Sequence, residues 1–110
     1  MKLVNLTPHK LNIVTDNGNI EIEPSGTIAR VKPTTVRIGT VNGIDVVKTT
    51  FGEVEGLPSP EKDTVYIVST LVLNALKGSR PDVVAPDTGP ESAIRDESGR
   101  IVGIRRFQII

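Results

Sequence analysis

The sequence of 110 residues contains no cysteine. Disulfide bonds, thiolate catalysis, iron–sulfur clusters and cysteine-based zinc sites are therefore excluded together. Aromatic side chains are almost as scarce, because Phe51, Tyr66 and Phe107 are the only ones. Proteins bind single-stranded nucleic acid on several exposed aromatic side chains. Three rings, of which we expect at least two to be buried, are too few for such a surface.

The chain also lacks an excess of charge, since 13 basic residues balance 13 acidic ones. Non-specific nucleic-acid binding depends on a net basic surface, so we do not expect a nucleic-acid partner. No apolar run approaches the ~20 residues of a membrane-spanning helix, and the first residues turn polar too early for a signal peptide. With the missing cysteines, this predicts a soluble intracellular protein without a membrane contact.

Valine and isoleucine dominate the apolar residues that the sequence does contain. β-branched side chains favour strands over helices, and ten glycines and eight prolines provide frequent turns. A chain of this length forms one hydrophobic core. We therefore expect a single domain over residues 1–110, built mainly of short strands.

Short turns between strand-like segments predict four β-hairpins, three of them within the first fifty residues. Asn17-Gly18 and Asn42-Gly43 provide the positive φ angles that hairpin turns require. The predicted hairpins include residues 10–15 with 20–23, 34–41 with 44–49, and 93–96 with 100–107, and a further turn at 24–26 leads into a strand over 27–31. Other strands are expected over residues 3–6 and 65–68, and a connecting loop over 51–63. This pattern predicts a β-rich α+β fold, either an antiparallel sheet of hairpins or a partly closed small barrel.

One short helix is expected directly after the apolar strand 65–68. Ser69 can cap its first turn, apolar residues then recur at helical spacing, and Gly78 can adopt the left-handed conformation that ends a helix. The alternative is a strand that continues through Leu73. The segment 74–78 is poor strand material, which favours the helix.

The end of the chain alternates in polarity over residues 101–108 and predicts an ordered strand. Leaving Phe107, Ile109 and Ile110 in water would forfeit roughly 1.5–3 kcal/mol each. We therefore expect these three side chains in the core or in a subunit interface, and a homodimer is consistent with the second case.

The segment after the helix, residues 79–90, contains three prolines and reads as a stiff loop. Arg80 precedes a proline, which forces it into an extended conformation. Arginine can grip an anion with two parallel hydrogen bonds, so we predict Arg80 as the main contact of a small anionic or nucleotide ligand. Asp82 would orient it, Thr88 would donate a neutral hydrogen bond, and Arg95 and Arg105 would add positive charge. The alternative is an internal Arg80–Asp82 pair that only stiffens the loop.

Other candidate chemistry is weaker. His9 is the only histidine and follows a proline in a turn, without the neighbours that a general base needs. Glu53 and Glu55 share a face of an extended loop, where they could perform acid–base chemistry. Paired carboxylates in a loop are more often solvent-exposed residues without a catalytic role. We therefore predict no catalytic set, no metal site and no cofactor.

Five phrases carry more information as a set: NLTPH at 5–9, PSGTIARV at 24–31, FGEVEGLP at 51–58, YIVS at 66–69 and RDESGRIVG at 95–103. Through them the chain resembles a family of small uncharacterised proteins encoded by phages and prophages of Gram-positive bacteria. The resemblance implies a viral origin and action in the host bacterial cytoplasm. It implies no functional residues, because the family has no assigned activity.

Three functions remain open from the sequence. The first is a non-enzymatic binding protein, for example a counter-defence protein that sequesters a nucleotide-type signal or blocks a host protein. The second is a structural or assembly component of the virion, which the neutral charge and β-rich composition favour. The third is a magnesium-dependent enzyme acting on nucleotides.

Overall fold

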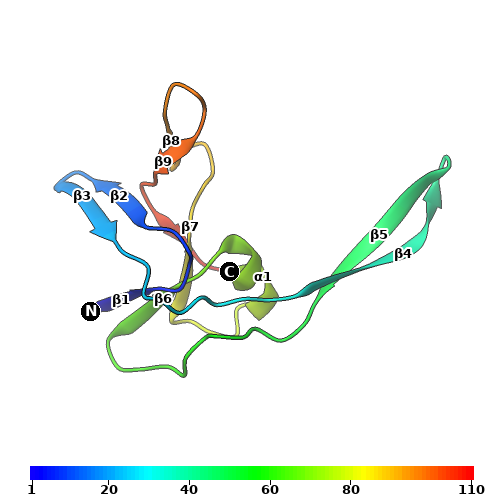
Figure 1. The fold of residues 1–110 in the computed structure, drawn as a ribbon, viewed down its shortest axis with the longest axis horizontal. Coiled ribbons are helices and arrows are strands. Elements are labelled where there is room, and N and C mark those ends of the chain that lie inside the picture. Colours follow the sequence, from blue (N-terminus) through cyan, green and yellow to red (C-terminus); the bar gives the residue numbers. More distant parts are fainter.

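A computed structural model describes residues 1–110, and its centre is a small mixed sheet (Figure 1). The sheet contains β1 (Lys2–Asn5), β6 (Thr64–Ile67), β7 (Val83–Pro86) and β10 (Phe107–Gln108), in that order. β6 pairs parallel with β1 and with β7, whereas β10 pairs antiparallel with β7. β1 and β6 are far apart in the sequence, whereas β6 and β7 are consecutive strands.

β6 lies between two neighbours and is buried, as its apolar sequence predicts. Tyr66 and Ile67 are almost inaccessible to water, and so is Val68 after the strand. The Tyr66 hydroxyl donates a hydrogen bond of 3.2 Å to the carbonyl of Ser59, so its one polar atom is satisfied. The core cluster around this strand consists of Leu6, Ala29, Tyr66, Val68, Val72, Leu73, Val83 and Ala85.

The predicted helix is confirmed as α1 (Thr70–Leu76), and it connects β6 to β7. The Ser69 hydroxyl accepts a hydrogen bond from the backbone N–H of Val72 and caps the first turn. At the other end Gly78 has the expected left-handed conformation, with φ of +78°. Lys77 before it is also left-handed, so the helix ends one residue earlier than the glycine alone indicates.

Three of the four predicted hairpins form, and each is a separate two-stranded sheet (Figure 1). They do not merge into one antiparallel sheet or close into a barrel. The β-rich α+β class is therefore confirmed, but the central sheet is mostly parallel. The hairpins are β2 (Leu11–Thr15) with β3 (Gly18–Ile22), β4 (Pro33–Val41) with β5 (Ile44–Phe51), and β8 (Ile94–Arg95) with β9 (Ile101–Gly103).

Two expectations for loops and strands are wrong. The predicted strand over 27–31 is absent apart from one bridge between Arg30 and Glu55. The predicted loop over 79–90 contains β7, because Val83 and Ala85 insert into the core beside β6. Burial against the neighbouring strand outweighs the prolines that flank this segment.

The predicted strand over 100–107 is also corrected. β9 ends at Gly103, Ile104 forms a bridge with Ile13, and the chain then bends before β10 joins β7. Ile109 and Ile110 are 70% and 62% exposed, so they are not part of the core. Their burial in a subunit interface stays a prediction.

No helix of the chain has the length and apolar character that crossing a bilayer requires.

Candidate functional site

Arg80, the predicted main ligand contact, forms hydrogen bonds with other groups of the chain. Its Nε and one terminal nitrogen donate to the two carboxylate oxygens of Asp82 at 2.9 and 2.8 Å, and the same terminal nitrogen donates to the carbonyl of Pro58 at 2.9 Å. The guanidinium also lies 6.0 Å from the centre of the Tyr66 ring. These contacts join the start of β7 to the loop before β6.

The electrostatics of this pair agree with an internal role. Hydrogen bonding to Arg80 lowers the pKa of Asp82, and hydrogen bonding to Asp82 raises the pKa of Arg80. The two side chains are only 19% and 17% exposed. A bidentate pair of this kind keeps both charges satisfied while they are partly desolvated, so the arrangement is the stiffening pair that the sequence left as an alternative.

The other predicted ligand residues lie elsewhere. Thr88 follows the carboxyl end of β7, whereas Asp82 precedes its amino end. Arg95 donates to the carbonyl of Gly99 within its own hairpin at 2.6 Å. The backbone N–H of Arg105 donates a hydrogen bond of 3.0 Å to the hydroxyl of the buried Ser92. The structure does not gather the five residues around one cavity, and their binding of a ligand stays a prediction.

A second internal ion pair braces the chain beyond β7. Arg106 donates to a carboxylate oxygen of Asp87, and the other oxygen of Asp87 accepts from the backbone N–H of Gly89 at 2.9 Å. The bond from Arg106 is the main cause of the lowered pKa of Asp87. No local pattern in the sequence indicates this contact, because 19 residues separate Asp87 from Arg106.

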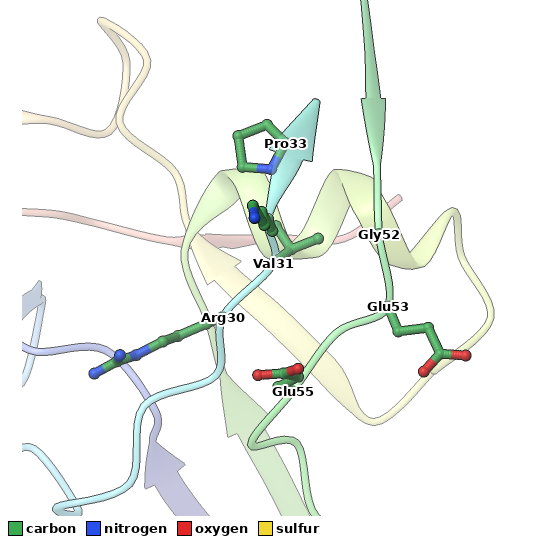
Figure 2. Close-up of a pocket in the computed structure, with 7 residues that line it drawn as sticks. Arg30, Val31, Pro33, Gly52, Glu53 and Glu55 are labelled. Atoms are coloured by element: carbon green, nitrogen blue, oxygen red, sulfur yellow. The ribbon is translucent and has the colours of Figure 1, made fainter. Parts of the chain in front are cut away.

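The largest hollow, about 610 Å³, lies at the base of the β4–β5 hairpin and is lined by residues 30–33 and 52–55. Figure 2 shows that Arg30 and Glu53 point to opposite sides of it, and no ion pair joins Arg30 to Glu53 or Glu55. A backbone ladder between Arg30 and Glu55 closes its base, with two hydrogen bonds of 2.8 Å. The hollow is therefore the junction of the hairpin with the domain, and its charged side chains do not converge on a common point.

A smaller hollow of about 350 Å³ lies near the carboxyl ends of β1, β6 and β7, where open α/β sheets often bind ligands. His9, Thr70 and Thr88 line it, together with prolines and the capping residue Ser69. No arginine or lysine lines this hollow. It offers hydroxyl groups and apolar surface, but no group that would bind an anion strongly.

No group of three or more His, Asp or Glu side chains is placed to hold a metal ion.

The feature that stands apart is the β4–β5 hairpin, which projects away from the rest of the molecule (Figure 1). Every residue of β4 is exposed, and in β5 only Val46 is partly covered. Asn42 and Gly43 at its tip both have positive φ, as a type I′ turn requires. The exposed large apolar residues of the hairpin are Val36, Ile38, Val41, Ile44, Val47 and Phe51.

Both faces of the hairpin carry apolar side chains. Paired residues of adjacent strands share a face, so Val36, Val41 and Ile44 lie on one face, with Lys48. Val47 and Phe51 lie on the other. A hairpin with one solvated face normally alternates apolar with polar residues. The absence of this alternation was a signal in the sequence that we interpreted only as strand propensity.

Comparison with family models, with curated proteins and with solved structures finds no match for this chain.

Proposed function

We propose that this chain is a non-enzymatic binding protein of phage or prophage origin that acts by protein–protein contact, with the β4–β5 hairpin as its docking element. The observation that carries the proposal is the exposure of apolar side chains on both faces of this hairpin. A two-stranded hairpin by itself is at best marginally stable in water. Docking on a protein surface would cover this apolar area and add order to the hairpin.

Protein contact has more support than capture of a small anion. Arg80 already donates three hydrogen bonds to groups of the chain, and Arg95 donates one to the carbonyl of Gly99 in the turn of its own hairpin. An anion would have to compete with Asp82 for the Arg80 guanidinium. By contrast, every residue of the two hairpin strands except Val46 is exposed.

Two of the functions open from the sequence involve docking on a protein: blockage of a host protein and assembly of a virion. Both would take place in the cytoplasm of the host bacterium. They differ in the partner, so recovery of the partner decides between them.

The test is recovery of partners from a Gram-positive host during phage infection. A tagged wild-type chain is compared with Val36→Lys/Ile44→Lys, which charges the hairpin. The matched control is Ile20→Lys/Val102→Lys, which charges two other hairpins at residues that are each 48% exposed. We expect a protein that the wild type and the control recover and the hairpin variant loses. Equal recovery by all three would overturn the proposal.

Calorimetry with cyclic and ADP-ribose-type nucleotides tests the rival function. We expect no heat of binding with the wild type. Heat that disappears in Arg80→Ala would instead favour sequestration of a small anionic signal.

A further inference from the structure

The charges of the β4–β5 hairpin differ between its two faces. Asp45 and Val47 lie two residues apart in β5 and therefore share a face, and Arg37 shares it because it pairs with Val47. The Arg37 guanidinium and the Asp45 carboxylate lie 3.5 Å apart and form an ion pair. This face contains no other ionisable residue, so its charges are balanced within the hairpin.

The opposite face has a positive charge without a counterpart. Lys48 is its only ionisable residue, and it takes part in no ion pair of the chain. Lys48 lies toward the base of the hairpin, and apolar side chains occupy the face from there to the tip. We call this surface the Lys48 face; it consists of Ile44, Val46, Lys48 and Thr50 of β5 and of their β4 partners Val41, Gly39, Val36 and Thr34.

A second unpaired lysine lies next to the base of this face. Lys77, directly after α1, is exposed and forms no ion pair. Lys48 and Lys77 line one hollow of about 450 Å³, together with residues 49–51 of β5 and Ala75 of α1. No acidic residue lines this hollow. Two positive charges on one hollow repel each other, and a negative group between them would relieve this repulsion.

We propose that the Lys48 face is the face that docks, and that its partner is a protein surface with an apolar patch bordered by carboxylates, which enter the hollow between Lys48 and Lys77. This inference rests on the proposed docking role of the hairpin and specifies its face and the chemistry of its partner. Complementary charges at the border of an apolar contact guide the encounter and reject wrong partners. The opposite face offers no such selection, because Arg37 and Asp45 already neutralise each other.

An acidic protein surface fits this face better than a nucleic acid does. Nucleic acids bind to extended basic surfaces that neutralise many phosphates. The Lys48 face has one basic residue among apolar ones, and the chain as a whole has no net charge. A protein interface with an apolar centre and a charged rim has the same composition as this face.

The first test uses two labelled synthetic peptides with the same apolar segment, one ending in a run of glutamates and the other in a run of lysines. Fluorescence anisotropy should show that the wild type binds the acidic peptide about tenfold more tightly than the basic one. The charge reversal Lys48→Glu/Lys77→Glu should invert this preference. Equal affinity of the wild type for the two peptides would overturn the inference.

The matched control is Lys2→Glu/Lys62→Glu. It changes the net charge by the same amount, at two exposed lysines that line none of the hollows. We expect this control to keep the preference of the wild type for the acidic peptide. A loss of preference as large as that of Lys48→Glu/Lys77→Glu would overturn the inference, since the net charge alone would then explain the binding.

The assignment of the face is tested by neutral substitutions, which do not depend on the lysines. Val36 and Val47 are 55% and 53% exposed and lie on opposite faces. Val36→Asn should weaken binding of the acidic peptide by about fivefold, whereas Val47→Asn should change it by less than about twofold. Equal effects of the two variants would overturn the assignment of the docking face.

The salt dependence separates the charge contribution from the apolar one. Raising the ionic strength from ~0.1 M to ~1 M shortens the screening length from about 10 Å to about 3 Å. The preference for the acidic peptide should therefore shrink, and a preference that salt leaves unchanged would overturn the role of the lysines. If the acidic peptide does not bind although the recovery of a host or phage protein depends on the hairpin, the docking role stands and the partner chemistry is wrong.

Discussion

β5 and β6 are both rich in β-branched and aromatic residues, yet they lie in opposite environments. β6 is enclosed by β1 and β7 and forms the centre of the core. β5 has a single neighbouring strand and is exposed over almost its whole length. The residue types of both segments therefore favour a strand, and the two strands differ in the segments that pack against them. β6 therefore contributes to the core of the domain, whereas most of the surface of β5 stays in contact with water.

The largest expected effect comes from truncating a buried side chain of β6. Tyr66→Ala removes a buried ring and should lower the free energy of unfolding by about 3–5 kcal/mol. Phe51→Ala, at the base of β5 and exposed, should change it by less than about 1 kcal/mol. Urea denaturation of both variants checks the difference. Similar losses would mean that the hairpin belongs to the cooperative core.

Two glycines with positive φ, one in the body of the domain and one at the tip of the hairpin, compare the backbone of the two regions. Gly56 has φ of +81°, and an added Cβ would lie 2.4 Å from the carbonyl oxygen of Ile28. Gly56→Ala should therefore destabilise the domain by about 2–4 kcal/mol, from strain and a steric clash together. Gly43 at the hairpin tip has a similar φ but open space around it. Gly43→Ala should leave the unfolding midpoint of the domain nearly unchanged, as measured by thermal denaturation.

The ion pairs of the two regions should respond differently to acid. The pKa of Asp82 is lowered in the folded protein, mainly by its hydrogen bonds with Arg80. The stability that this carboxylate contributes is therefore present above its ordinary pKa of 3.8 and is lost as the pH falls through the lower folded value.

Asp82→Asn should thus be less stable than the wild type at pH 6, with the difference shrinking below about pH 4. Asp45 on the hairpin faces Arg37 at 3.5 Å, but both side chains are exposed. Asp45→Asn should alter stability by less than about 0.5 kcal/mol at either pH. Denaturant titrations at pH 6 and pH 3 check both variants. A constant deficit of Asp82→Asn across this range would contradict the assignment.

The smallest effect is expected from the apolar tip of the hairpin. Ile44→Thr keeps a β-branched side chain and removes exposed apolar surface, so the unfolding free energy of the dilute protein should change by less than about 0.5 kcal/mol. A loss above 1 kcal/mol in dilute solution would show that this side chain already has a partner within the chain.

Local features of the fold could be predicted well from the sequence. The Asn42-Gly43 turn, the Ser69 cap and the left-handed Gly78 each depend on a few neighbouring residues. β7 was missed because the prolines that flank it signal a loop, and its pairing with β6 depends on contacts outside the segment.

The candidate site was predicted less well. The sequence places Arg80 and Asp82 two residues apart, but it does not show that Pro58 accepts a third hydrogen bond or that Thr88 lies beyond the far end of β7. The hairpin itself was predicted correctly, while its exposure was not, because no local pattern reveals that nothing packs against it.

The β-rich α+β class, three of the hairpins and the position of the helix follow from local sequence, since turns, caps and strand propensities act within a few residues. Tertiary contacts, by contrast, set the pairing of Lys2 with Thr64, the place of β7 in the central sheet and the exposure of the β4–β5 hairpin. These outcomes depend on which apolar surfaces meet across the whole chain. Burial against distant segments is not encoded in any single stretch of residues.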